Sequence, residues 1–75
     1  MAYILHTVNS DNSDSRVVYE DYVKARRAYW DIERLPLDEA SKKYNLVELL
    51  CSYSDGKVYV IVHRDFSKEL KFRGR

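Results

Sequence analysis

Two apolar runs in the last third of the chain have the composition of β-strands. Residues 46–53 and 58–63 are rich in aliphatic, β-branched and aromatic side chains, which suit a pleated strand. Between them lie Ser54, Asp55, Gly56 and Lys57. An Asp-Gly pair between two such runs indicates a β-hairpin with a two-residue type I′ turn. We therefore predict that Asp55 and Gly56 form the loop and that Ser54 faces Lys57.

This turn fixes the register of the predicted hairpin, and the register separates two faces. The first face is apolar and is expected to be core, with the pairs Tyr53–Val58, Cys51–Val60 and Leu49–Val62. The second face is mixed, with the pairs Ser52–Tyr59, Leu50–Ile61 and Glu48–His63.

A second hairpin is predicted at the start of the chain. Residues 3–8 are rich in β-branched and aromatic side chains, and residues 9–15 are seven consecutive turn-forming residues. Residues 16–20 read as the returning strand. A rival interpretation starts a helix at Val18, but Val-Val-Tyr is poor helix material.

The middle of the chain has helical periodicity. Asp21 is a candidate N-cap, and Tyr22, Ala25, Tyr29 and Ile32 recur at the spacing of one helix face. Pro36 ends this helix, because the residue before a proline is disfavoured in the α region. Residues 38–43 place acidic side chains first and basic ones last, as the dipole of a second, short helix prefers.

These elements predict one small α+β domain over residues 1–75, with a β-β-α-β-β order, an antiparallel sheet of two hairpins and the main helix packed on one face. The helix stripe is expected to cover the apolar face of the C-terminal hairpin, formed by Val47, Leu49, Cys51, Val58, Val60 and Val62. A β-α-β-β order fits nearly as well. Residues 66–75 alternate weakly, end basic and are expected to form a flexible tail.

Composition narrows the function classes. With 13 Lys and Arg against 12 Asp and Glu, the net charge is +1, whereas a nucleic-acid mimic or a basic nucleic-acid coat needs a large excess of one sign. The single cysteine cannot form an intrachain disulfide. The apolar runs are too short for a signal peptide or a membrane span. We expect a cytoplasmic protein without membrane association.

Candidate catalytic chemistry is sparse. Two glycines exclude a glycine-rich phosphate cradle, and one cysteine with two histidines excludes the usual Cys-rich zinc patterns. The best constellation is Glu48 opposite His63, and Cys51 points to the other face in the predicted register. We interpret Glu48 and His63 as a cross-strand charge pair and predict a protein with no catalytic residues, metal site or cofactor.

Exposed aromatic and aliphatic residues favour protein binding instead. Trp30 falls off the helix stripe beside Arg26, Arg27 and Arg34, which is the composition of a binding hot spot. The opposing interpretation packs Trp30 at the edge of the core or under the turn at residues 35–37. Leu50, Tyr59 and Ile61 form an apolar patch on the mixed face, which a protein partner or a second copy in a homodimer would cover.

The alternative function is nucleic-acid binding through the basic C-terminal segment. Arg64, Lys68, Lys71, Arg73 and Arg75 would contact phosphates, and Phe72 or Phe66 would stack on bases. In size and composition alone, the chain resembles the small accessory proteins that bacteriophages encode to bind and block host proteins. That resemblance implies a non-catalytic inhibitor of a larger protein.

Overall fold

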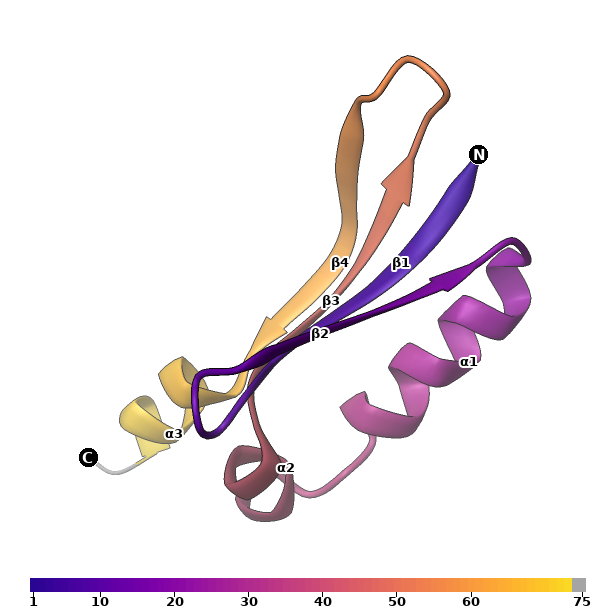
Figure 1. Cartoon of the computed structure of the whole chain (residues 1–75). Coiled ribbons are helices and arrows are strands. Elements are labelled where there is room, and N and C mark those ends of the chain that lie inside the picture. The colour runs from indigo at the N-terminus through magenta and orange to yellow at the C-terminus, as the bar shows by residue number, and fades with distance from the viewer. Residues whose placement is uncertain (74–75) are drawn as a thin grey trace.

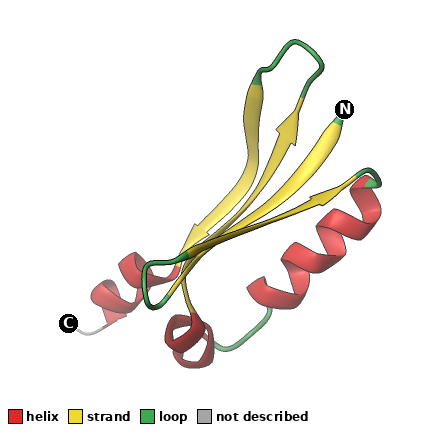
Figure 2. Cartoon of the chain, in the orientation of Figure 1, coloured by secondary structure: helices red, strands yellow, loops and turns green. Residues whose placement is uncertain are grey.

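The computed structural model describes the backbone of residues 1–73 and the side chains of residues 1–69. Its elements are β1 (Ala2–Asn9), β2 (Asp14–Tyr19), α1 (Tyr22–Glu33), α2 (Leu37–Lys43), β3 (Tyr44–Ser52), β4 (Val58–Asp65) and α3 (Phe66–Arg73). Figure 1 and Figure 2 show the strands as one twisted sheet with the helices beside it. The predicted α+β class with a four-stranded antiparallel sheet is confirmed.

The two hairpins join through their first strands. The strand order is β2-β1-β3-β4, and every neighbouring pair is antiparallel. Leu5 of β1 pairs with Leu49 of β3 and with Val17 of β2. The central strands are therefore β1 and β3, and the edges are β2 and β4.

The turn of the C-terminal hairpin is one residue longer than predicted. The amide of Tyr53 donates to the carbonyl of Lys57 at 2.9 Å, and the amide of Gly56 donates to the carbonyl of Tyr53 at 3.0 Å. The loop is therefore Ser54, Asp55 and Gly56, and Gly56 adopts a left-handed φ of 87°. This is a three-residue loop built on a turn followed by a left-handed residue, which is the next most common hairpin type.

A β-bulge in β4 then restores the predicted register. Glu48 pairs with His63 and Leu49 with Val62, as predicted, but Leu50 pairs with Val60. Ile61 is the extra residue, so Val60 and Ile61 lie against the single residue Leu50. Beyond the bulge Cys51 pairs with Tyr59 and Ser52 with Val58, and the predicted pairs there are wrong.

The bulge exchanges the faces of the hairpin tip. Paired residues point to the same side of an antiparallel sheet, so Tyr59 shares the face of buried Cys51, while Val58 and Val60 share the face of Ser52 and Leu50. Val58 and Val60 are exposed, and the prediction that they belong to the core is wrong.

The core lies between one face of the sheet, here called the helix-side face, and the helices. The N-cap of α1 is Asp21, whose carboxylate accepts from the amide of Val23 at 2.9 Å. The helix buries Ala25 and Tyr29, and Ile32 packs beside them, whereas Tyr22 is partly exposed. The buried cluster consists of Leu5, Ala25, Tyr29, Leu37, Ala40, Val47, Leu49 and Phe66.

The segment predicted as a tail contains the third helix. Residues 66–73 form α3, and Phe66 at its start is completely buried in the core cluster. The carboxylate of Asp65 caps α3, because it accepts from the Lys68 amide at 3.0 Å and from the Ser67 hydroxyl at 2.8 Å. Gly74 and Arg75 lie outside the described residues.

All three helices contribute to this one cluster. The opposite side of the sheet is here called the bare face, and no helix of residues 1–73 packs on it. The tip of the β3–β4 hairpin extends beyond the helices (Figure 1). None of the helices in residues 1–73 combines the length and the apolar character needed to cross a bilayer.

Candidate interaction surfaces

The solvent side of α1 carries a stripe of exposed residues. Val23, Arg27, Trp30 and Arg34 follow one another at spacings of four, three and four, which places them in one line along a helix. We call them the outer stripe. Trp30 is 62% exposed, so the interpretation that packs it against the core is wrong. The indole presents most of its surface to solvent between two arginines.

The arginines near Trp30 are held in different ways. Arg34 pairs with Asp31 at 3.4 Å, and both side chains are more than half exposed. The guanidinium of Arg26 lies 5.7 Å from the ring centroid of the buried Tyr29, so it covers the core edge by a cation–π contact. Burial raises the pKa of the Tyr29 hydroxyl. Arg27 and Arg34 thus flank Trp30 on the stripe, and Arg26 belongs partly to the core.

The bare face has an apolar row that crosses all four strands. Val18, Ile4, Leu50 and Val60 are cross-strand partners in β2, β1, β3 and β4. We call them the apolar row. Val18 is 63% exposed and Val60 58% exposed, and Val58 and Ile61 beside them are exposed as well. The predicted patch of Leu50 and Ile61 is therefore part of a longer feature.

A polar row lies directly beside the apolar row. It consists of Arg16, His6, Glu48 and His63, which are again cross-strand partners. His6 Nδ1 lies 2.8 Å from Glu48 Oε1, and His6 Nε2 lies 3.3 Å from Asp14 Oδ2. The contact of His6 with Glu48 was not predicted from the sequence. The two residues are 42 positions apart and meet only because β1 pairs with β3.

Tyrosines gather at one end of the helix-side face. Tyr19, Tyr3 and Tyr59 stand in one cross-strand row. Tyr22 packs on Tyr3 with ring centroids 5.2 Å apart, and Tyr53 packs edge-on against Tyr59 at 5.4 Å. Tyr59 was predicted to share a face with Leu50 and Ile61, and this is wrong because the bulge turns it to the other side. A side-chain hydrogen bond with Cys51 raises the pKa of Tyr53.

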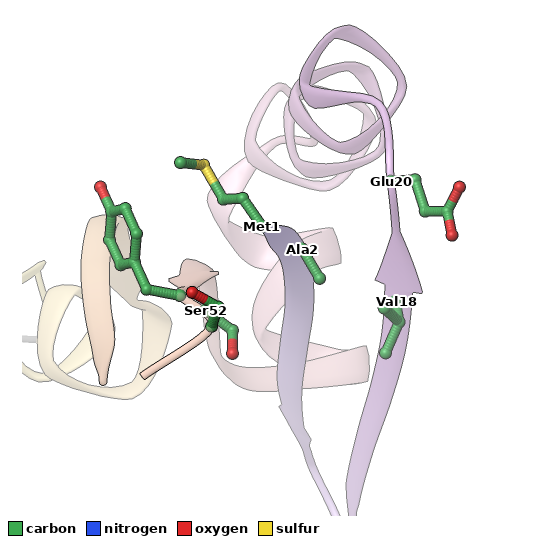
Figure 3. Close-up of a pocket in the computed structure, with 7 residues that line it drawn as sticks. Met1, Ala2, Val18, Glu20 and Ser52 are labelled. Carbon is green, nitrogen blue, oxygen red and sulfur yellow. The ribbon is translucent and has the colours of Figure 1, made fainter. Parts of the chain in front are cut away.

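A shallow hollow of about 410 Å³ lies at the end of the bare face near the N-terminus. Its lining comprises Met1, Ala2, Val18, Glu20, Ser52, Tyr53 and Ser54. Figure 3 shows Met1 and Ala2 between Val18 and Glu20 on one side and Ser52 on the other. Glu20 is the one carboxylate in this lining. The other lining side chains include no histidine, lysine or arginine, so the hollow is mainly an apolar depression of the surface.

Among the described side chains, two of the predicted phosphate contacts are placed, Arg64 and Lys68, and one of them is engaged within the fold. The guanidinium of Arg64 is bound to Glu69 and to the Glu33 carbonyl, so it is engaged within the fold. Lys68 is exposed on the first turn of α3. Lys71, Phe72 and Arg73 belong to α3, but their side chains, like all of Arg75, lie outside the described part. Phe66, the other predicted stacking residue, is core.

Among the described residues, no group of three or more His, Cys, Asp or Glu side chains is arranged to hold a metal ion. Comparison of the chain with protein-family models, with curated proteins and with solved structures found no match in any of the three searches.

Proposed function

We propose that this protein is a non-catalytic binding module that recognises a larger protein through the outer stripe of α1. The observation that carries the proposal is the exposure of Trp30 between Arg27 and Arg34. Tryptophan and arginine are the residues most enriched among binding hot spots, because they combine a large contact area with directional polar groups.

The chemistry of the stripe defines its partner. A carboxylate can accept two parallel hydrogen bonds from one guanidinium, and Trp30 and Val23 supply apolar area next to Arg27. The existing Arg34–Asp31 pair is exposed, and such pairs contribute little free energy. Arg34 can therefore exchange Asp31 for a carboxylate of the partner. The stripe fits an apolar pocket bordered by acidic side chains.

The stripe is also held in place before binding. The Asp21 cap orders the first turn of α1, and the buried Ala25 and Tyr29 fix the helix on the sheet. A surface on a rigid helix loses little conformational entropy on association. A module of this kind would block any activity located at the surface that it covers, which is the role implied by the resemblance to phage accessory proteins.

The test is an affinity capture followed by a direct measurement. Wild-type protein and Trp30→Ala are immobilised, and the proteins that each captures are compared. A protein that binds the wild type but not the variant is then purified, and its affinity for both forms is measured by titration. We expect Trp30→Ala to weaken binding by at least tenfold, and moderate salt to leave apolar anchoring largely intact. The control is Val60→Lys, which alters the bare face, and it should bind as wild type.

Equal binding by wild type and Trp30→Ala would overturn the proposal. Retention on heparin together with a salt-sensitive gel shift would favour the nucleic-acid alternative instead. That alternative stays a prediction, and the engagement of Arg64 by Glu69 removes one of its proposed phosphate contacts.

A further inference from the structure

The bare face is complementary to itself. Its apolar row of Val18, Ile4, Leu50 and Val60 and its polar row of Arg16, His6, Glu48 and His63 each cross the strands in the order β2, β1, β3, β4. We propose that this face is the interface of a homodimer whose two-fold axis runs parallel to the strands, between β1 and β3. Such an axis lays β1 of one copy over β3 of the other, and β2 over β4.

This axis matches the apolar row with itself. Ile4 lies over Leu50 of the second copy, and Val18 lies over Val60 of the second copy. Each of these contacts occurs twice, as in any isologous interface. The exposed valines at the two ends of the row, 63% and 58% accessible in the single chain, become the apolar contacts at its two flanks.

The centre of the polar row also matches under the same axis, and Arg16 lies over His63 of the second copy at its two ends. His6 lies over Glu48 of the second copy, and Glu48 lies over His6 of the second copy. The intrachain pair at 2.8 Å thereby becomes an alternating set of four groups at the centre of the interface. Such a set fixes register and orientation more than it adds affinity.

Two acidic residues lie on the bare face beyond the polar row. The proposed axis places Asp14 over Asp65 of the second copy, but each carboxylate is already bound within its own chain. Asp14 lies 3.3 Å from His6 and 3.8 Å from Arg16, and Asp65 caps α3. The hydrogen bonds of this cap lower the pKa of Asp65. The net charge of +1 per chain adds little repulsion between two copies.

The alternative two-fold axis, perpendicular to the strands, fits less well. When this axis passes between the two rows, the apolar row of one copy lies over the polar row of the other. When it passes along the apolar row, it places the polar row over Ala2, Ser52 and Val58. Both arrangements bury charged groups without partners, which is costly.

The size of the face is sufficient for a weak dimer. Four strands spaced by about 4.8 Å, each with about 20 Å of length from six residues, give roughly 400 Å² per copy in projection. Corrugation of the side chains raises the accessible area above the projection, so the total comes close to the roughly 1,000 Å² that a specific interface needs. We therefore expect a weak dimer, with a dissociation constant within the range that the sedimentation experiment covers.

The experiment is sedimentation velocity on the full chain up to about 500 µM, a range chosen for a micromolar dimer. Val18→Lys and Val60→Glu each place a charge in the apolar row, and each alone should raise the dimer dissociation constant at least tenfold. Both positions are more than half exposed, so the fold tolerates these changes. The matched control is Val23→Lys, at a position 62% exposed on α1, and it should dimerise as wild type.

Mixing the two variants tests the axis itself. A heterodimer of Val18→Lys with Val60→Glu has one Lys–Glu contact and one Val–Val contact, so dimerisation should return in the mixture. A wild-type protein that stays monomeric would overturn the dimer, and a mixture that stays monomeric would overturn this axis. Since the outer stripe lies on the other side of the molecule, either result leaves the test with Trp30→Ala unaffected.

Discussion

Arg64 holds the carboxylate of Glu69 with two hydrogen bonds, from Nε to Oε2 at 2.8 Å and from Nη2 to Oε1 at 3.0 Å. Its third nitrogen donates to the Glu33 carbonyl at the end of α1 at 2.8 Å. The guanidinium also lies 5.1 Å from the ring centroid of Phe66. One side chain of β4 therefore connects α1, α3 and the core.

Replacing Arg64 by lysine should destabilise the fold by about 1–2 kcal/mol, because an ammonium cannot make the two parallel bonds or the planar contact with Phe66. Urea unfolding followed by circular dichroism measures the change. Arg27→Lys, at an exposed position on α1, is the control and should stay within about 0.5 kcal/mol of wild type. Equal stability of the two variants would show that Arg64 is a surface residue in solution.

Phe66→Ala should cost about 3–5 kcal/mol, since it empties a fully buried aromatic site. In a domain of this size such a loss is comparable to the whole free energy of unfolding, so the far-UV spectrum should report a largely unfolded chain. Phe66→Leu keeps most of the volume and should remain folded with a lower melting temperature. A folded, wild-type-like Phe66→Ala protein would place α3 outside the core.

Gly56→Ala should cost about 1–2 kcal/mol, because a Cβ is disfavoured at its φ of 87°. The cost comes from the backbone alone, since a Cβ built there meets no atom within 4 Å. Gly56→Asn should recover most of the loss, because asparagine tolerates the left-handed region. Thermal melts of the two variants distinguish this backbone effect from a steric one. If the cost were steric, the larger asparagine would lower the melting temperature more than alanine does.

The cap of α3 should make stability depend on acid pH. The backbone N–H of Lys68 is the main cause that lowers the pKa of Asp65 below its usual value of 3.8. A depressed carboxyl pKa contributes stability above the unfolded-state pKa and loses it as the pH falls through the folded-state pKa. Asp65→Ala should therefore cost about 1 kcal/mol near pH 7 and less near pH 2. A difference in unfolding free energy that is constant with pH would contradict this role.

Trp30 is the single tryptophan of the chain, and its exposure makes it a reporter. Its emission should already be that of a hydrated indole in the folded protein, and unfolding should shift it little, while circular dichroism changes fully. Binding of a partner to the outer stripe should shift the emission to the blue and reduce quenching by acrylamide. Dimerisation through the bare face should leave both unchanged. A blue-shifted emission in the free protein would mean that Trp30 is covered.

Local chemistry explains which elements could be predicted from the sequence. The Asp21 cap, the α1 periodicity and the dipole-matched charges of α2 act over a few residues, and each is found where it was expected. The turn at Asp55 and Gly56 was placed correctly but assigned the wrong length. Both two- and three-residue loops accept glycine at their left-handed position, so the dipeptide does not distinguish them.

Features that depend on distant pairing could not be predicted in this way. Phe66 was assigned to a tail because its neighbours are charged, yet the sheet and α2 form the cavity that it fills. The contact of His6 with Glu48 depends on β1 lying beside β3. Among the candidate site residues, Trp30 is exposed as expected, whereas Arg64 is engaged by a glutamate five residues further along the chain.

The bulge at Ile61 gives one strand two roles. On its C-terminal side, β4 delivers Val62 and Arg64 to the helix-side face; on its N-terminal side, it delivers Val58 and Val60 to the bare face. A hairpin with a two-residue loop and no bulge would return the strand to simple alternation, with both valines turned inward and Tyr59 outward. Deletion of Ile61 alone would instead remove the bulge and leave Val60 against Leu50, so the surface that this strand presents is set by the length of the hairpin loop together with the bulge.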